Sequence, residues 1–376
     1  MTVAGQGTPC EDTRQGAYRL RAATRWVASS PRERGCGVWC VEHTDEHPTI
    51  KVERKGGRSV ATWRGLMTCG HIWTCPVCSA NKRAARVERI ERALQHTGGR
   101  WQMLTVTLRH RDGMPLRELV RGLMAAWRRT RQGGKIQRIW QGRVSASVRA
   151  LEVTHGANGW HPHVHVLLRT SDWTDDEREA LQDRWELAIV RELGEHVRPD
   201  DLHGLTWSHA LDASSASDRK RGRYLAKAGL EVAGVAKQAK SSSTWDLARR
   251  AADGDSRAFW LWREFYEATK GRRAIELDDR AAAAATAHEA AENAHVEEGE
   301  GGSLPSYIQV QRDDVRALRI WERSFPAIMA VVLHAAEGEH GELAVREWIA
   351  VARARMTRHR PTPHATSPPV DHGTIQ

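Results

Sequence analysis

Three short segments near the middle of the chain are rich in apolar and β-branched residues, which predicts β-strands at residues 101–109, 144–155 and 160–169. Residues 156–159 (Gly-Ala-Asn-Gly) separate the second and third segments and predict a tight hairpin turn. The helical period of residues 115–130 predicts a helix between the first and second strands. The middle of the chain is therefore expected to form a strand, a helix and a β-hairpin.

Further signals extend this order toward the C-terminus. Thr174 and Glu177 have the spacing of a capping box, at the start of a helix expected to end at Gly194. A short strand is expected at residues 205–209 and a helix at residues 218–232. The resulting βαββαβα order predicts the α+β class, with helices packed against an antiparallel sheet.

The flanking regions differ in composition. Residues 81–96 predict a helix with many arginines, and residues 244–271 predict two helices broken at residues 253–255. Residues 305–357 predict a small helical unit. The expected domains are a flexible arm (1–35), a cysteine-rich module with a basic helix (36–98), the α+β domain with the helices that follow it (99–275), an Ala/Glu/Gly linker (276–304), the helical unit (305–357) and a disordered tail (358–376).

The charge of the chain favours a polyanionic partner. Lys and Arg outnumber Asp and Glu by 57 to 47, which gives a net charge of +10 and a pI near 9.6. Such a balance is typical of proteins that bind DNA or RNA. No run approaches the roughly 20 apolar residues that span a bilayer, and no secretory signal is apparent, so we expect a cytoplasmic protein without membrane association.

Three histidines form a candidate metal site on the third predicted strand. Because alternate residues of a strand share a face, His161, His163 and His165 point the same way. A direct hairpin would place Glu152 opposite His163 and the small Ala150 opposite His165. Imidazoles beside a carboxylate suit Mn²⁺ or Mg²⁺. A register slip of one residue would move Glu152 to the other face of the sheet. Alternating histidines can also form a strand face that is only solvated and binds no metal.

The cysteines predict a second metal site, of a structural kind. Five of the six cysteines lie within residues 36–78. Cys75-Pro-Val-Cys78, with Cys69 upstream, has half the spacing of a zinc ribbon. Buried reduced thiols are the alternative. The candidates for the fourth zinc ligand are Cys36, which we prefer, Cys40 and His71.

The helix that follows the cysteines is a candidate DNA contact. Lys82, Arg83 and Arg86 lie on this predicted helix, where a zinc module would hold them against the phosphates of bound DNA. The alternative is that these charges only form a solvated helix face.

Tyr224 is a candidate nucleophile on the predicted helix at residues 218–232. Tyr224, Lys227 and Glu231 share one face of this helix. A tyrosine hydroxyl, whose pKa is about 10, needs a nearby cation or metal to react, and Lys227 lies one turn away. Arg221 and Arg223 beside it are further candidate DNA contacts. Alone this pattern is a weak signal, because most tyrosines of this kind are structural.

Three blocks in this order resemble rolling-circle replication initiators of the HUH endonuclease superfamily. They are residues 103–108 (Met-Leu-Thr-Val-Thr-Leu), 161–165 (His-Pro-His-Val-His) and 224–227 (Tyr-Leu-Ala-Lys). The order and spacing of the blocks are more specific than any one block. The phrases at residues 69–78, 151–160 and 268–275 look like replication proteins of actinobacterial plasmids, so the resemblance covers about residues 36–355.

The resemblance implies a metal-dependent, site-specific DNA endonuclease and strand transferase. It implies a five-stranded antiparallel sheet in which His163 and His165 hold a divalent metal, with Glu152 as our candidate third ligand. Tyr224 would attack one strand of the plasmid origin, single-stranded at the nick, leaving a 5′-phosphotyrosine and a 3′-OH primer. Attack by a later 3′-OH would rejoin the displaced strand, and Glu231 would activate water at termination.

Two departures from the family pattern bear on this expectation. One tyrosine occupies the motif, which disfavours a two-tyrosine mechanism. Residues 276–279 replace an expected Trp-Ser, which leaves the role of the C-terminal region open.

Partners and competing functions follow from the same sequence. No Gly-x4-Gly-Lys-Ser/Thr loop is present, so a host helicase and a DNA polymerase are expected partners. A transposase or mobilisation relaxase would use the same chemistry. A zinc-containing DNA-binding regulator without catalysis is the alternative from another class.

Overall fold

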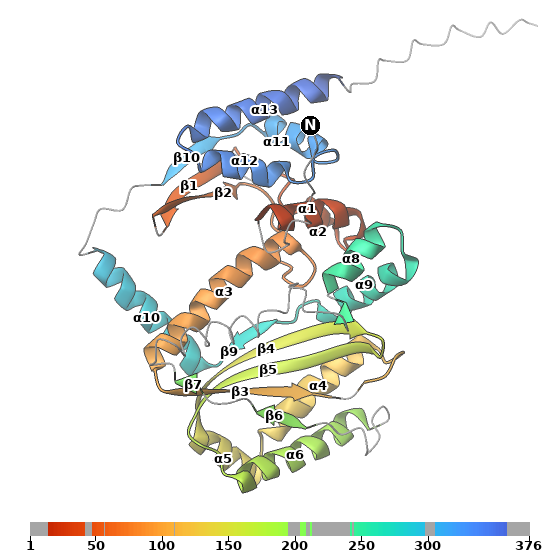
Figure 1. Ribbon diagram of the computed structural model, residues 1–376, viewed down its shortest axis with the longest axis vertical. Helices are drawn as coiled ribbons and strands as arrows, with labels where there is room; N and C mark the ends of the chain where they lie inside the picture. The colour runs from red at the N-terminus through yellow and green to blue at the C-terminus, as the bar shows by residue number, and fades with distance from the viewer. Residues whose placement is uncertain are drawn as a thin grey trace, which may run out of the picture. The chain divides into compact units, whose positions relative to one another are not determined.

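The computed structural model divides the chain into two compact units (Figure 1). Unit 1 comprises Met1–Cys36 and Thr68–Ser303, and unit 2 comprises Gly37–Met67 and Leu304–Gln376. The structure describes residues 14–41, 47–55, 57–108, 110–194, 204–207, 211–212, 241–242, 244–297 and 305–358.

Unit 1 is built on an antiparallel sheet, in agreement with the predicted α+β class. Its strand order is β6-β3-β5-β4-β8, with β7 paired to β3 and β9 paired to β4. Because a strand has two edges, β6 and β7 share the outer edge of β3, and β8 and β9 share that of β4. The strands are β3 (Arg100–Thr107), β4 (Val144–Gly156), β5 (Gly159–Thr170), β6 (Leu205–Trp207), β7 (Leu211–Asp212), β8 (Ser241–Ser242) and β9 (Ile275–Leu277).

The register of the β4–β5 hairpin is the predicted one. Glu152 pairs with His163, Ala150 pairs with His165, and the hairpin closes at Gly156 and Gly159. Gly159 has a φ of 81°, and a Cβ on it would lie 3.0 Å from the Cα of Asp112. A glycine is therefore required where the turn meets the neighbouring loop.

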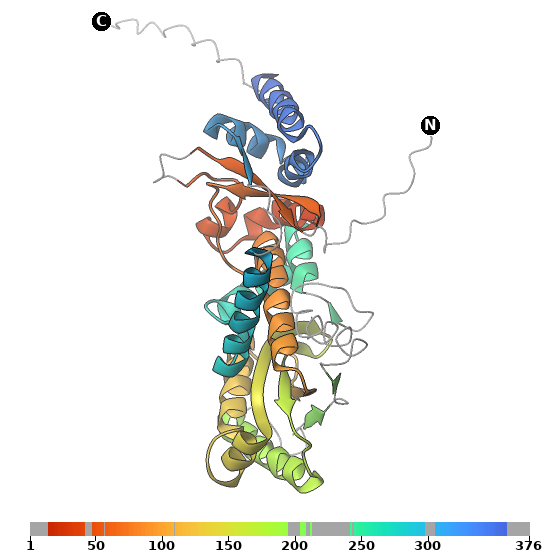
Figure 2. The same ribbon diagram turned by 90° about the vertical axis from the view of Figure 1, so that its left-hand side faces the viewer.

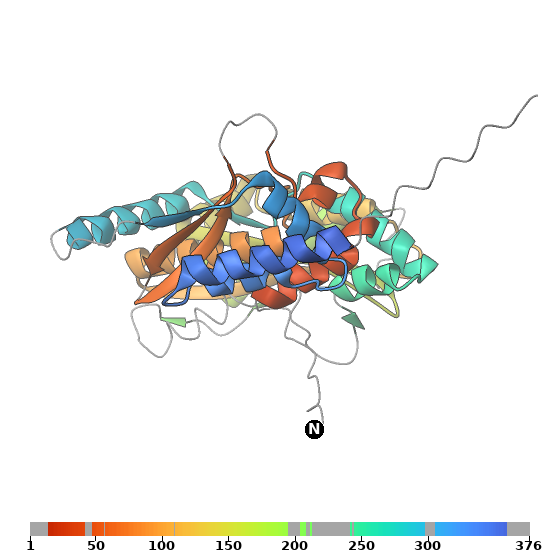
Figure 3. The ribbon, with the colours of Figure 1, turned by 90° about the horizontal axis from the view of Figure 1, so that it is seen from above.

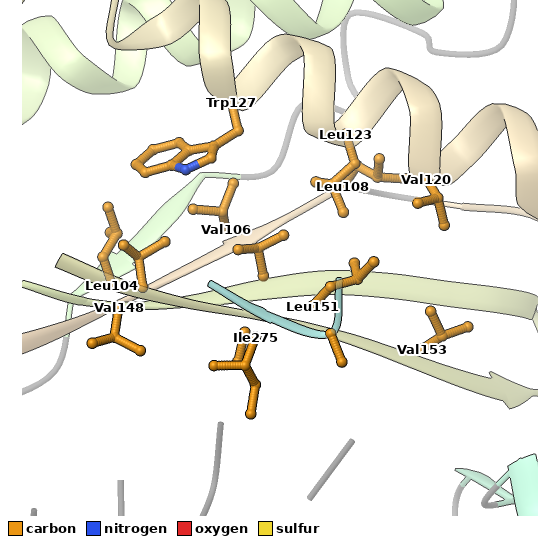
Figure 4. Packing of buried hydrophobic residues seen from close by; sticks show 14 of the residues in the cluster. Leu104, Val106, Leu108, Val120, Leu123, Trp127, Val148, Leu151, Val153 and Ile275 are labelled. Carbon is orange, nitrogen blue, oxygen red and sulfur yellow. The ribbon is translucent and has the colours of Figure 1, made fainter. Parts of the chain in front are cut away.

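The two faces of the sheet have different partners. Leu104 and Val106 of β3 are fully buried, and Val166 and Val164 of β5 lie opposite them. Helix α4 (Leu116–Thr130) packs on this apolar face (Figure 4). The histidines alternate with these residues, so they lie on the opposite face.

The predicted capping box is present at the start of α6, where the Thr174 side chain accepts a hydrogen bond from the backbone N–H of Glu177. Helices α3 and α10 run side by side (Figure 2). The other helical elements and their bounds are α1 (Arg14–Thr24), η1 (Arg25–Val27), α2 (Pro31–Gly35), α3 (Pro76–Thr97), α5 (Gly134–Arg143), α6 (Asp175–Leu193), α8 (Thr244–Ala252), α9 (Ser256–Thr269) and α10 (Asp279–Glu297).

Two segments differ from the sequence-based expectation. The arm expected at residues 1–35 contains α1, η1 and α2, because Ala17 and Leu20 are buried within unit 1. The linker expected at residues 276–304 contains the end of β9 and α10, which packs along α3. Both differences arise from contacts with residues far away in the sequence.

Unit 2 is a three-stranded antiparallel sheet with three helices (Figure 3). The hairpin of β1 and β2 pairs through β1 with β10, and this pairing joins residues 37–67 to the C-terminal segment rather than to the cysteine module. Helix α12 packs on β1 and β2. The elements are β1 (Thr49–Lys55), β2 (Arg58–Arg64), β10 (Ser306–Gln309), α11 (Arg312–Trp321), α12 (Ile328–Ala336) and α13 (Gly341–Arg358).

Within the described part of the chain, every helix is too short or too polar to cross a bilayer.

Candidate metal centres

Glu152, His163 and His165 meet at the centre of the unit 1 sheet. Nε2 of His163 lies 2.9 Å from Oε2 of Glu152, and Nε2 of His165 lies 3.2 Å from the same oxygen. All three side chains are half-buried, and their ligand atoms lie within 4.8 Å of one another. Strand pairing alone produces this convergence, because β4 supplies the carboxylate directly opposite the imidazole of β5.

This donor set fits a divalent metal ion. Two imidazoles and one carboxylate leave coordination positions open for other ligands. Ligand atoms at right angles and about 2.1 Å from a metal are separated by about 3 Å. The separations of 2.9 and 3.2 Å match this spacing.

The charge of Glu152 is stabilised at the site. Burial alone would raise the pKa of its carboxyl group, but the hydrogen bonds from His163 and His165 outweigh burial and lower the pKa to about 2. Glu152 is therefore an anion at neutral pH, as a metal ligand has to be.

His161 lies beside this group but outside it. Its Nε2 is 2.9 Å from the hydroxyl of Thr107, and its ring stacks on His110 at 4.6 Å. Burial, together with the neighbouring His163 and His110, lowers the pKa of His161 to about 4. The ring is thus neutral at physiological pH.

Three further polar residues lie on this face that the sequence analysis did not predict. Thr105 and Thr107 lie on β3 opposite His165 and His163, and His110 follows the strand. The alternation that placed the histidines on one face applies equally to the predicted first strand. The sequence did not show that β3 pairs with β5, and this pairing is what places the threonines beside the histidines.

The four preferred cysteines converge within unit 1. The sulfur of Cys36 lies 3.5 Å from that of Cys78 and 3.6 Å from that of Cys75, and Cys69 lies 3.7 Å from Cys78. A disulfide bond would require about 2.05 Å. A tetrahedron of sulfurs about 2.3 Å from a zinc ion has edges of about 3.8 Å, so this buried cluster is able to hold zinc.

Hydrogen bonds within the cysteine cluster favour the thiolate form of Cys36. Hydrogen bonds from the thiols of Cys69 and Cys75 lower the pKa of Cys36, and the same bonds raise the pKa of Cys69 and Cys75. The backbone N–H groups of Cys69 and His71 donate to the sulfurs of Cys36 and Cys69, both at 3.4 Å. Such donors favour thiolates, the form of cysteine that binds metals.

The other candidates for the fourth ligand have different partners. The imidazole Nδ1 of His71 lies 2.8 Å from the buried carboxylate of Glu33, which also accepts from Thr74. Cys40 belongs to unit 2, where it pairs with Leu66 in an isolated bridge.

The predicted DNA contacts are described only in part. Lys82 is exposed on α3 and donates to the backbone oxygen of Gly70 at 3.1 Å. Burial lowers the pKa of the half-buried Arg86. The side chain of Arg83 lies outside the described residues. So do all the candidates of the tyrosine segment, which are Arg221, Arg223, Tyr224, Lys227 and Glu231.

Residues 64–186 match the family model described as "Replication protein". This segment is therefore similar to replication proteins, and we call it the replication-protein domain. It contains three of the four clustered cysteines and the complete group of Glu152, His163 and His165. The match confirms the resemblance to rolling-circle replication proteins that the motifs indicated.

Curated relatives are similar to this chain as well. "Protein rep" of Streptomyces lividans is 30% identical over 299 residues, which cover 60% of this chain and 65% of the relative. "Protein rep" of Bacillus amyloliquefaciens is 28% identical over 146 residues, 34% of this chain and 42% of the relative. "Neomycin resistance protein" of Streptomyces cyanogenus is 31% identical over 143 residues, 30% of this chain and 33% of the relative.

The chain covers less than two thirds of each of these relatives. No solved structure gives a significant match.

Proposed function

We propose that this chain is a rolling-circle replication initiator that nicks one strand of a plasmid origin. The observation that carries the proposal is the group formed by Glu152, His163 and His165 within the replication-protein domain. Its ligand atoms are already close enough to bind one metal ion. A purely structural strand face would not require a half-buried carboxylate between two imidazoles.

The proposal includes an HUH-type arrangement of the sheet. In support of it, the histidines occupy β5, which lies between β3 and β4 in an antiparallel sheet. The chain leaves β7 on one edge of this sheet and returns at β8 on the other edge. The stretch that carries Tyr224 is therefore attached at both edges of the sheet that holds the metal group.

The nicking step uses the residues of this chain as follows. His163, His165 and Glu152 hold the divalent metal, Mn²⁺ or Mg²⁺, which when bound polarises the scissile phosphate as a Lewis acid. The phenolate of Tyr224 attacks phosphorus, and the bond from phosphorus to the 3′ oxygen breaks. The departing oxygen takes a proton to become the 3′-OH primer, while Lys227 offsets the negative charge that develops at phosphorus.

The 5′-phosphotyrosine conserves the energy of the broken bond. Attack by a new 3′-OH on this linkage releases Tyr224 and rejoins the displaced strand without a nucleotide cofactor. Water activated by Glu231 would instead end the cycle.

The cysteine group serves a structural role in this proposal. A zinc ion held by Cys36, Cys69, Cys75 and Cys78 would fix the start of α3, since Cys78 lies in its first turn. Lys82, Arg83 and Arg86 follow on the same helix and would contact origin phosphates, with Arg221 and Arg223 near the nick. A host helicase and DNA polymerase would then act from the cytoplasm on the nicked plasmid.

The test is a nicking assay on the supercoiled source replicon in Mn²⁺ or Mg²⁺. We expect the wild type to produce nicked circles with protein attached to the 5′ end. Tyr224→Phe and His163→Ala should abolish this product. Tyr307→Phe, which changes an exposed tyrosine of unit 2, is the matched control and should retain it.

The same assay separates the competing functions. Sequence-specific binding without nicking in any metal would overturn the catalytic proposal and favour a DNA-binding regulator. Nicking that persists in Tyr224→Phe would reject this tyrosine as the nucleophile.

A further inference from the structure

Two threonines of β3 each contact a different histidine of the metal-bearing face. The hydroxyl of Thr105 lies 3.0 Å from Nδ1 of His165. The hydroxyl of Thr107 lies 2.9 Å from Nε2 of His161. The two threonines belong to the same strand, but they contact different ring nitrogens. Thr105 contacts Nδ1 of one histidine and Thr107 contacts Nε2 of the other.

We propose that Thr105 is a positioning residue for metal binding, which holds His165 with Nε2 directed at the metal, whereas Thr107 serves a histidine that is not a ligand. The inference rests on the proposed metal centre of Glu152, His163 and His165. It adds a residue outside the ligand set on which the affinity of that centre depends.

The hydrogen-bonding capacity of a hydroxyl explains why Thr105 suits this role. Without metal, His165 can carry its proton on Nε2 and donate to Glu152, while Thr105 donates to the unprotonated Nδ1. A metal on Nε2 requires that nitrogen to be unprotonated, so the proton of the neutral ring moves to Nδ1. Thr105 can then accept from Nδ1, because a hydroxyl both donates and accepts. The same contact supports the ring before and after metal binding.

The second ligand histidine has no equivalent support among the described residues. Nδ1 of His163 is buried and has no hydrogen-bond partner within that part of the protein. Thr105 thus orients one histidine of the ligand pair, His165, through a hydrogen bond that either tautomer of the ring can make. Partners at this second position of a metal-bound histidine typically change metal affinity by 10- to 100-fold.

Thr107 provides an internal comparison for this role. It holds His161, whose Nε2 is already engaged and whose ring stacks on His110. His161 is also outside the group of converging ligand atoms. Loss of the Thr107 hydroxyl should therefore leave the metal ligands in place.

The experiment measures Mn²⁺ affinity of the full chain, loaded with zinc, by electron paramagnetic resonance of free Mn²⁺. Thr105→Val removes the hydroxyl at nearly constant volume, and we expect Mn²⁺ binding weaker by about 10-fold or more. Thr105→Ser restores a hydroxyl and should recover most of the affinity. Thr107→Val should bind Mn²⁺ within about twofold of the wild type. Circular dichroism and zinc content would verify that each variant is folded.

The outcomes separate this inference from the proposed function. Wild-type affinity in Thr105→Val overturns the role of Thr105 but leaves the metal centre intact. An equal loss in Thr105→Val and Thr107→Val indicates a general effect of disturbing β3 and also overturns it. Absence of Mn²⁺ binding by the wild type would overturn the metal centre itself.

Discussion

At the scale of single residues, the carboxylate of Glu152 determines what its face of the sheet can bind. It accepts hydrogen bonds from two imidazoles, and these bonds keep its pKa at about 2 despite burial. A neutral amide at this position would retain the size of the side chain but not its charge. The residue therefore allows the contribution of charge to be separated from that of packing.

Glu152→Gln should weaken binding of Mn²⁺ at neutral pH by at least about 10-fold, because a charged oxygen ligand is replaced by a neutral one. Isothermal titration calorimetry of the zinc-loaded protein would measure this effect. Glu179→Gln, at an exposed position of α6, is a control expected to keep wild-type affinity. Equal affinity in Glu152→Gln and the wild type would exclude Glu152 as a ligand.

His161 predicts a pH dependence of stability in the metal-free protein. Its pKa falls from 6.5 to about 4 on folding, because burial disfavours the charged ring. Between these values the unfolded chain binds a proton that the folded chain does not, so the free energy of unfolding falls as the pH falls from 6.5 to about 4. His161→Gln should show a shallower fall in urea titrations across this window. An identical slope in both proteins would contradict the assignment.

At the scale of elements, the β4–β5 hairpin was predictable because its signals are local. The alternating histidines and the Gly-Ala-Asn-Gly turn together specify one register, and Glu152 follows from that register. The pairing of the hairpin β1–β2 with β10 was not predictable, because its partners are separated by more than half of the chain. Thr105 and Thr107 were missed for the same reason, since their role depends on which strand lies beside β5.

Gly159→Ala should destabilise unit 1 by about 1–3 kcal/mol, because the residue has a positive φ and its Cβ would approach the backbone of Asp112. Gly142→Ala is the control, since Gly142 is helical and has open space around its Cβ position. It should be neutral or slightly stabilising. Urea midpoints of the two variants would test this, and equal midpoints would reject the strain.

Glu264 of α9 connects its own helix with β5 and with the start of α4, on the face of the sheet opposite the histidines. Its carboxylate accepts from Nε1 of Trp160 at 2.8 Å and from the backbone N–H of Leu116 at 2.7 Å. Glu264→Ala should therefore lower the stability by about 2–4 kcal/mol, since two donors lose a charged acceptor. Glu267→Ala, which removes an exposed carboxylate of the same helix, should change stability by less than about 0.5 kcal/mol. Thermal unfolding would compare the two, and a similar small effect in both would show that Glu264 has no linking role.

At the scale of the whole molecule, the two candidate metal-binding groups among the described residues lie in unit 1, while unit 2 is formed by both flanks of the replication-protein domain. The sequence indicated both groups, because metal ligands have characteristic types and spacings. The sequence did not indicate which segments form unit 2, because that depends on strand pairing between segments that share no motif. Metal content is accordingly the property of the whole chain that the sequence predicts most directly.

The purified chain should contain one zinc ion per molecule in the cysteine group. Cys75→Ser should lose this zinc and unfold at a lower temperature, because three remaining thiolates cannot close a tetrahedral site. Cys40→Ser should retain the zinc, since Cys40 is not one of the four cysteines whose sulfurs converge. Elemental analysis by mass spectrometry would decide, and an equal zinc content in all three proteins would place the ion elsewhere.

The proposed mechanism requires that Tyr224 becomes covalently joined to the cut strand. The most direct measurement is mass spectrometry of the protein recovered from the nicking reaction, after nuclease and protease digestion. We expect a nucleotide joined through its 5′ phosphate to the peptide that contains Tyr224, and no such peptide from His163→Ala. A nucleotide on another residue, or nicked DNA whose 5′ phosphate is free of protein, would contradict it.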